Sequence, residues 1–201
     1  PRTVLAELEG QHAELSPAAL ASREDLRHLP FLTLDPPNAS DHDDAVCVEA
    51  LPRGGSRLWV AIADVSARVP EGSALDREAL RRSNSVYFPD RAIPMLPHLL
   101  SGDLCSLRPG LDRSTVVAVL DLDARGEVAS RRFTRAVIRS RARLSYDEGA
   151  AVIDPAHAHP AARPPADPEI VAQLRALAKV ATGLMERRFE AGSIDFDLPS
   201  A

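Results

Sequence analysis

The sequence predicts an α+β fold, with a mostly antiparallel sheet and helices packed against it. The first observation is a series of short apolar segments separated by turn residues such as Gly, Pro and Asp, which is typical of strands joined by tight connections. The second is the pair of apolar segments at residues 115–123 and 128–137, which a short Gly-containing turn joins into a hairpin. The third is a set of longer segments of helical character between the strands.

Residues 1–29 are expected to form a polar, helical lead-in, and residues 30–201 the domain proper. Ser16 followed by Pro17 would begin a short helix in the lead-in, because Ser is a preferred N-cap and Pro is preferred in the first turn. The pattern then changes to a short apolar strand that leads into Asp35, after which two prolines force a turn.

The rest of the chain alternates between strands and helices. Strands are expected at residues 31–34, 45–50, 58–65, 86–88, 92–95, 115–123, 128–137 and 193–198. Helices are expected at residues 73–82, at a segment that begins with Tyr146, and at residues 169–190. Residues 154–168, rich in Pro, Ala and His, are expected to form a surface loop. The strand at residues 193–198 has no partner sequence after it, so we expect the chain to be truncated at its C-terminus.

The composition is that of a soluble globular protein, with 45% apolar and 26% charged residues. No run reaches the roughly 18 apolar residues of a membrane span. No signal segment opens the chain either, so we expect a cytoplasmic protein without membrane contact. Cys47 and Cys105 lack metal-knuckle spacing and are expected to be buried free thiols. The net charge of −5 is unusual for a nucleic-acid-binding protein. However, all but one of the 24 Lys and Arg residues are arginines, which suit phosphate contacts.

Four acidic residues gather in one segment, Asp35-Pro-Pro-Asn-Ala-Ser-Asp41-His-Asp43-Asp44. Crowded carboxylates repel one another, so either a cation neutralises them or at least one takes up a proton. Oxygen donors without thiolates select a hard ion, Mg²⁺ or alternatively Mn²⁺, over Zn²⁺. Such a group can hold two metal ions about 4 Å apart, which clamp the attacking and leaving oxygens in phosphodiester hydrolysis. This interpretation requires that the carboxylates share a cavity.

Other structures can also produce an acidic segment, and a solvated loop is the commonest of them. An EF-hand is excluded, because its sixth position requires Gly where this chain has Val46, and its twelfth requires Glu where it has Pro52. A phosphatase that forms an aspartyl-phosphate would place an Asp-x-Asp pair directly after a hydrophobic strand, whereas this strand leads to Asp35 alone. A metal-dependent phosphatase or nucleotidyl enzyme with a coincidental acid cluster stays open as an alternative.

The segment Leu34-Asp35…Ser40-Asp41-His42-Asp43-Asp44-Ala45-Val46 resembles the signature of the ribonuclease II and ribonuclease R family catalytic domain, the RNB domain. Further motifs of that family follow in the same order at residues 61–66, 85–97, 104–107, 112–113 and 138–148. The resemblance covers residues 25–198. It implies a hydrolytic 3′→5′ exoribonuclease that acts on single-stranded RNA, releases nucleoside 5′-monophosphates and uses two metal ions.

The resemblance also implies roles for single acidic residues. Asp35, Asp41 and Asp44 match Mg²⁺ ligands. Asp43 matches the most sensitive catalytic carboxylate of the family, which completes the metal sphere and helps to activate the attacking water. Asp64 lies at the end of a strand expected beside the site. It is a candidate to orient the metal ligands through hydrogen bonds without binding the metal itself. His42 is expected to face solvent and not to bind metal.

Two tyrosines match residues of the family that contact RNA. Tyr87 corresponds to an aromatic that stacks on a base near the 3′ end, a contact that contributes about 1–3 kcal/mol per base whatever the sequence. The alternative for Tyr87 is a core aromatic. Tyr146 corresponds to a tyrosine that helps to distinguish ribose from deoxyribose through the 2′-hydroxyl, and its alternative is packing at the start of a helix. Phe196 is a weaker candidate for a second stacking aromatic.

The same resemblance sets expectations for parts outside the chain. The family's catalytic Arg and a Glu near the 3′ nucleotide would follow residue 201, and OB-type cold-shock and S1 domains would flank the chain. The 201 residues alone are therefore expected to be an incomplete enzyme, and a monomer. A rival interpretation is an RNA-binding homologue that keeps the fold and has lost catalysis. The four aspartates argue against it, but the absent Arg leaves it open.

Overall fold

The computed structural model describes the chain except for residues 1, 10, 12–13, 53, 89 and 195–201. Phe196 and most of the strand predicted at residues 193–198 lie outside the described residues. None of the described helices is long and apolar enough to cross a bilayer.

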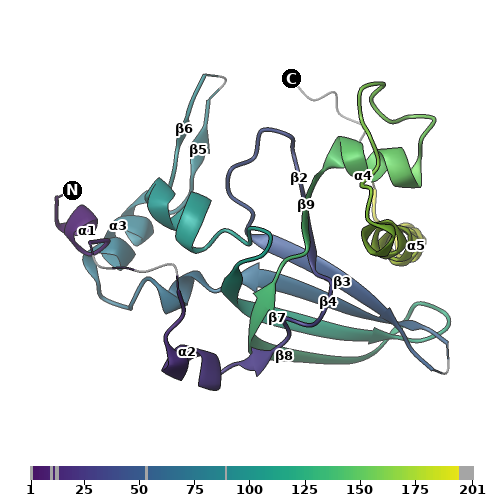
Figure 1. The fold of residues 1–201 in the computed structure, drawn as a ribbon, viewed down its shortest axis with the longest axis horizontal. Helices are drawn as coiled ribbons and strands as arrows, with labels where there is room; N and C mark the ends of the chain where they lie inside the picture. The colour runs from purple at the N-terminus through teal and green to yellow at the C-terminus, as the bar shows by residue number, and fades with distance from the viewer. Residues whose placement is uncertain (1, 10, 12–13, 53, 89, 195–201) are drawn as a thin grey trace.

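The described strands form one large mixed sheet and one small hairpin (Figure 1). The order in the sheet is β1-β8-β7-β4-β3-β2-β9, in which β1 pairs with β8 and β2 with β9 in parallel, and the other pairs are antiparallel. The predicted α+β fold with a mostly antiparallel sheet is confirmed. The strands of the sheet are β1 (Glu24–Asp25), β2 (Leu32–Asp35), β3 (Asp44–Ala50), β4 (Ser56–Ala63), β7 (Asp112–Leu122), β8 (Val128–Arg139) and β9 (Ala142–Ser145), and the hairpin consists of β5 (Val86–Tyr87) and β6 (Ala92–Ile93).

Several of the described helices begin where the sequence supplies a capping side chain. Ser16, Ser73 and Ser145 each accept a hydrogen bond from a backbone N–H of the first turn, which satisfies one of the free donors there. The strand β4 ends earlier than predicted, because Val65 begins a 3-10 turn instead of continuing the strand. The helices are α1 (Arg2–Ala6), α2 (Pro17–Ala21), the 3-10 turn η1 (Val65–Ala67), α3 (Ala74–Arg82), the π-helical turn η2 (Leu100–Leu104), α4 (Tyr146–Ile153) and α5 (Pro168–Glu190).

The main core lies on one face of the sheet. Alternate residues of β3, β4 and β7 point into it, because successive side chains of a strand face opposite ways; Cys47, Trp59 and Val117 are among them. Leu75 of α3 packs against this face. Cys47 and Cys105 are both buried and free, as predicted.

The lead-in packs on the same core. Four apolar residues of the lead-in are buried within it: Val4, Leu8, Leu26 and Leu29. The strand β1 adds Glu24 and Asp25 to the edge of the sheet. The described residues of the lead-in therefore pack directly on the rest of the domain.

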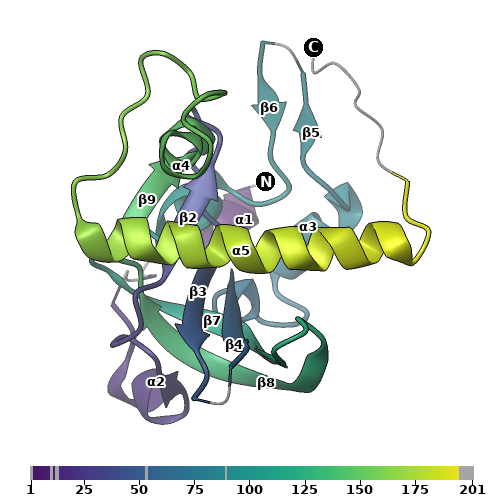
Figure 2. The same cartoon turned by 90° about the vertical axis from the view of Figure 1, so that its right-hand side faces the viewer.

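A smaller core lies on the opposite face, under α5, which crosses the sheet (Figure 2). Leu32 and Leu144 from adjacent parallel strands pack there against Leu174 of the helix. The Gln173 side chain also hydrogen-bonds both the N–H and the carbonyl of Val48, each at 3.0 Å. This helix therefore fixes the strands β2, β3 and β9, which hold or adjoin the acidic segment.

Candidate active site

Asp35 is the last residue of β2, a strand that lies between β3 and β9, and its side chain is buried, with 8% of the residue exposed. Pro36 and Pro37 follow and end the strand, because proline has no N–H to donate to the ladder. The Asp35 carboxylate accepts a hydrogen bond from Nδ1 of His42 at 2.8 Å. An ionised carboxylate can only accept, which assigns the proton to Nδ1.

The expectation that His42 faces solvent is wrong, because only 3% of this residue is exposed. Its backbone N–H donates to the hydroxyl of Ser106 at 3.1 Å, and its carbonyl accepts from the N–H of Leu107 at 2.7 Å. These bonds turn the His42 side chain inward toward Asp35 and leave Asp41 and Asp43, on either side of it, exposed. A histidine in a polar segment has no sequence signal for such burial, since its partners come from another part of the chain.

Three of the four aspartates line one cavity of about 800 Å³: Asp35, Asp41 and Asp43. Tyr87 of β5 lines the same cavity, and 74% of this residue is exposed, which excludes the core alternative. The hairpin that carries Tyr87 stands away from the main sheet (Figures 1 and 2). The remaining walls come from the loop after β2, the end of β4 and its following turn, the base of the β5–β6 hairpin, and the segment from β6 through η2. Their residues are Pro36, Asn38, Ala39, Ser40, Ala63, Val65, Ser85, Ala92, Pro94, Met95, Leu96, His98, Ser101 and Cys105.

Asp44, the first residue of β3, is not among the residues that line this cavity, but its carboxylate lies in the electric field of the others. Partial burial raises the pKa of Asp44, and the charges of Asp43 and Asp35 raise it further, while His42 acts in the opposite direction. The part of the shift that comes from Asp43 and Asp35 shows that the Asp44 carboxylate lies close enough to interact with both of them.

The arrangement can be tested against a divalent cation. Within the described part of the chain, no group of three or more His, Cys, Asp or Glu side chains stands close enough to form a finished metal site. The donor chemistry nevertheless fits Mg²⁺, because three carboxylates face one cavity and the fourth is coupled to two of them. Asp41, Asp43 and Asp44 are exposed, so their side chains have room to turn toward a common ion.

Tyr146 is the first residue of α4, and 58% of it is exposed. It does not line the cavity, but β9 pairs with β2 so that Ser145 lies opposite Asp35. Tyr146 therefore follows directly after the residue that pairs with Asp35, at the same end of the sheet.

Asp64 is buried just beyond β4, where its neighbours Ala63 and Val65 line the cavity but Asp64 itself does not. Its carboxylate pairs with Arg23 at 2.6 Å and accepts a hydrogen bond from Ser66 at 2.6 Å. Burial alone would raise the pKa of Asp64, but the bonds from Ser66 and Arg23 outweigh burial and lower it. The contacts of Asp64 thus connect the sheet to the lead-in, and none of its described hydrogen bonds reaches the four aspartates.

Comparison with known proteins places this geometry in a family. Residues 23–201 match the family model of the RNB domain. The chain belongs to the RNB domain family. Its resemblance to ribonuclease R is confirmed by curated relatives: ribonuclease R of Aquifex aeolicus is 42% identical over 203 residues, and that of Acidithiobacillus ferrooxidans 45% identical over 197. The alignments cover 100% and 98% of this chain but only 28% and 44% of those relatives, so the chain spans less than half of their length.

Solved structures agree with this assignment. Ribonuclease R of Mycoplasma genitalium in complex with double-stranded RNA is 31% identical, with a TM-score of 0.86 over 97% of this chain and 34% of that one. Yeast Ssd1, described as a pseudonuclease, shares the fold at 21% identity and a TM-score of 0.71, over 88% of this chain and 21% of that one. The RNB fold thus occurs in proteins with and without nuclease activity.

Sequence reasoning missed two buried polar residues of this RNB domain that contact the acidic loop or its support, Ser106 and Arg113. Both lie in the family motifs at residues 104–107 and 112–113. For Ser106, a polar residue inside the otherwise apolar motif at residues 104–107 was the available signal, because buried polar groups require partners. The charged pair Asp112-Arg113 offered no such contrast.

Proposed function

We propose that the protein that carries this RNB domain is a hydrolytic 3′→5′ exoribonuclease that releases nucleoside 5′-monophosphates from single-stranded RNA. One observation carries the proposal: Asp35, Asp41 and Asp43 share a cavity with the exposed ring of Tyr87. The carboxylates can hold hard cations, and the ring can hold a base, so one cavity offers both halves of a phosphodiesterase site.

In this proposal Asp35, Asp41, Asp43 and Asp44 hold Mg²⁺, with Mn²⁺ as the alternative ion. When bound, the ions supply charge stabilisation and lower the pKa of a bound water, as two-metal sites do. Asp43 lies on the exposed cavity wall, where it orients the attacking water and helps to remove its proton. Asp35 is the fixed member of the group, because His42 holds its carboxylate from within the fold.

Tyr87 stacks on a base near the 3′ end and so brings the terminal phosphodiester toward the aspartates. Stacking suits an enzyme that degrades any sequence, because every base has an aromatic face. Tyr146, exposed at the same end of the sheet, contacts the 2′-hydroxyl and distinguishes ribose from deoxyribose. Ribonuclease R of Mycoplasma genitalium has been solved with double-stranded and with ribose-methylated single-stranded RNA, which supports RNA as the substrate class here.

The rest of the proposal concerns the whole protein. It acts in the cytoplasm as a monomer, and OB-type domains outside this chain add further contacts to single-stranded RNA. This chain has a net charge of −5, which agrees with those domains supplying much of the positive charge that binds the RNA phosphates.

The test uses the full-length protein, Mg²⁺ and oligo(A) RNA labelled at either end. With a 3′ label, labelled nucleoside 5′-monophosphate should appear first. With a 5′ label, the substrate should shorten gradually from the far end. Asp43→Asn should reduce hydrolysis at least about 100-fold, the lower range for loss of a group that takes part in proton transfer, while RNA binding is retained.

The outcomes separate the alternatives. RNA binding without any shortening, in the wild-type protein, would favour a homologue that binds RNA and has lost catalysis. Neither binding nor shortening would favour a phosphatase or nucleotidyl enzyme. Release of the 5′ label first would contradict the proposed 3′→5′ direction but not the proposed ribonuclease activity.

A further inference from the structure

We propose that Ser106 and Arg113 are positioning residues for the acidic cluster. A chain of buried hydrogen bonds runs from the Arg113 guanidinium through Ser106 and His42 to the carboxylate of Asp35. This inference rests on the proposed function only for the role of Asp35 and its neighbours as cation ligands. Arg113, Ser106, His42 and Asp35 are respectively 3%, 1%, 3% and 8% exposed, so the whole chain of bonds is shielded from water.

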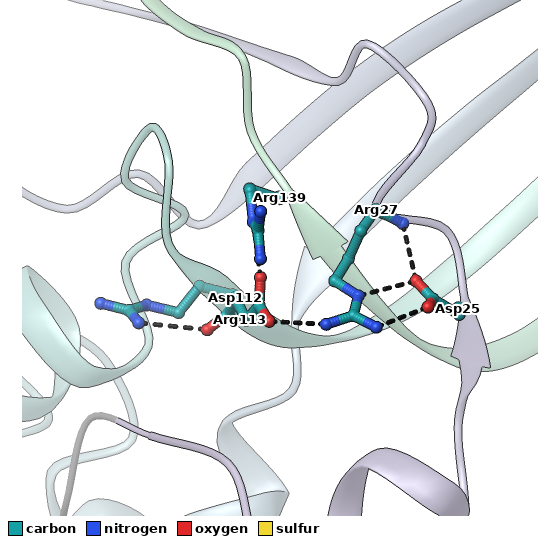
Figure 3. Close-up of polar contacts among 5 residues, drawn as sticks. All are labelled: Asp25, Arg27, Asp112, Arg113 and Arg139. Atoms are coloured by element: carbon teal, nitrogen blue, oxygen red, sulfur yellow. Dashed lines mark hydrogen bonds and ion pairs between the residues drawn. The ribbon is translucent and has the colours of Figure 1, made fainter.

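The chain starts on β7, where Asp112 and Arg113 face opposite ways, as adjacent residues of a strand do. The Asp112 carboxylate lies between Arg139 at 2.7 Å and Arg27 at 2.9 Å, and the Arg113 side chain extends away from Arg27 (Figure 3). Arg113 points into the interior, where burial lowers its pKa. Its nearest carboxylate, that of Asp103, is 3.9 Å away.

Backbone carbonyls satisfy this buried guanidinium. Nε donates to the carbonyl of Ser106 at 2.9 Å, Nη2 to that of Asp103 at 3.1 Å, and Nη1 to that of Asp112 at 3.2 Å. A buried cation is costly unless its donors find acceptors, and each of its three nitrogens donates to a carbonyl here. The bonds to Asp103 and Ser106 hold one turn of the chain, residues 103–106, against β7. Lysine could not replace this fork, because its single ammonium cannot span three carbonyls.

The turn at residues 103–106 holds the acidic loop, residues 36–44, near the middle of that loop. The Ser106 hydroxyl accepts the N–H of His42, and the N–H of Leu107 donates to the His42 carbonyl, so His42 is bound on both sides of its own backbone. The His42 ring then donates to Asp35, across the loop. Asp41 and Asp43 are the immediate neighbours of His42, so the same bonds fix where their backbones enter the cavity.

Such a support is needed because the loop repels itself. Asp35, Asp41 and Asp43 line one cavity, and the repulsion between these like charges acts to spread the loop when no cation is present. Bonds that hold the loop in place before a cation arrives reduce the entropy lost on binding. Groups that support metal ligands in this way commonly change metal affinity by about 10–100-fold.

The decisive variant is Ser106→Ala, which removes the acceptor of the His42 N–H and little volume. The matched control is Ser140→Ala: Ser140 is 2% exposed and bonds the carbonyls of Phe31 and Ala142, away from the acidic loop. In the full-length protein, Mn²⁺ binding is measured by calorimetry without RNA, and amide hydrogen exchange is followed over residues 36–44. Ser106→Ala should weaken Mn²⁺ binding about 10–100-fold and speed exchange in the loop, and Ser140→Ala should do neither.

Arg113→Lys should also weaken Mn²⁺ binding and speed hydrogen exchange in the loop. If the Arg113 variant does not fold, Ser106→Ala alone decides the inference. Wild-type Mn²⁺ affinity in Ser106→Ala, or an equal loss in Ser140→Ala, overturns the inference. So does a wild-type protein that binds no Mn²⁺. If the wild type binds Mn²⁺ but degrades no RNA, the proposed function fails while the comparison of the two serine variants still decides this inference.

Discussion

Tyr87 presents the largest exposed aromatic surface on the cavity that holds the aspartates, with 74% of the residue exposed. A ring that is already exposed and has no packing role can be removed with little effect on the fold. Tyr87→Ala should therefore weaken RNA binding by about 1–3 kcal/mol, the range for one stacked base, and Tyr87→Phe should bind nearly as the wild type does. Filter binding of oligo(A) to both variants, in an Asp43→Asn background that prevents hydrolysis, measures this. Equal losses in the two variants would show that the hydroxyl, and not the ring, makes the contact.

At the scale of single residues, the sequence located the acidic cluster because four carboxylates in ten positions need an explanation wherever they fold. The sequence could not show which member is buried. Asp35 is fixed by His42, and His42 is buried by Ser106 and Leu107, more than sixty residues later in the chain. Such long-range hydrogen bonds leave no local periodicity, so the prediction for His42 was wrong.

At the scale of elements, the long strands and helices were predicted and the short parallel strands were not. The hairpin of β7 and β8 and the helix α5 carry strong apolar patterns over many residues. β1 and β9 are two and four residues long, and each forms by pairing with a strand remote in sequence. β9 matters for the site, because its parallel pairing with β2 sets Ser145 opposite Asp35 and so determines where Tyr146 begins α4.

The start of α4 gives a prediction at this scale. Ser145 accepts the N–H of Glu148 at 3.2 Å, and the Glu148 carboxylate accepts the N–H of Ser145 at 2.8 Å, which is a complete capping box. Ser145→Ala should destabilise the first turn of α4 by about 1 kcal/mol, or roughly a fivefold rise in local opening. Amide hydrogen exchange over residues 146–153 measures this local opening. Ser73→Ala, at the N-cap of α3, is the control and should speed exchange in α3 only. Unchanged exchange in α4 of the Ser145 variant would contradict the prediction.

At the scale of the whole molecule, the lead-in is attached to the sheet by charges as well as by its apolar residues. Arg27 binds both Asp25 and Asp112 and so connects the end of β1 to β7 (Figure 3). Those groups are partly exposed, and such pairs contribute little. The pair of Arg23 and Asp64 differs, because their side chains are only 7% and 2% exposed. No pattern in the sequence indicates this pair, since a polar lead-in resembles a linker until its partner in the sheet is known.

This buried pair predicts how stability depends on pH. The pKa of Asp64 is lowered in the folded state, so between the folded and unfolded pKa values the unfolded chain binds more protons. The contribution of Asp64 is therefore fully present above its ordinary pKa of 3.8 and is lost as the pH falls below that value toward the folded pKa. At pH 7, Arg23→Gln should cost about 3–5 kcal/mol, because it leaves Asp64 buried and charged without its partner.

Asp64→Asn removes the titrating group, so the difference in free energy of unfolding between wild type and this variant should be largest at neutral pH and shrink below about pH 4. Denaturant-dependent hydrogen exchange of the sheet amides in β4 and β7 reports that free energy for this domain alone. Asp121→Asn is the control: the pKa of Asp121 is also lowered, chiefly by Arg57, but its side chain is 26% exposed, and the pH-dependent difference should be smaller because water screens the pair. A difference for Asp64→Asn that does not change between pH 7 and pH 3 would mean that the pKa of Asp64 is the same in the folded and the unfolded states, and would contradict the prediction.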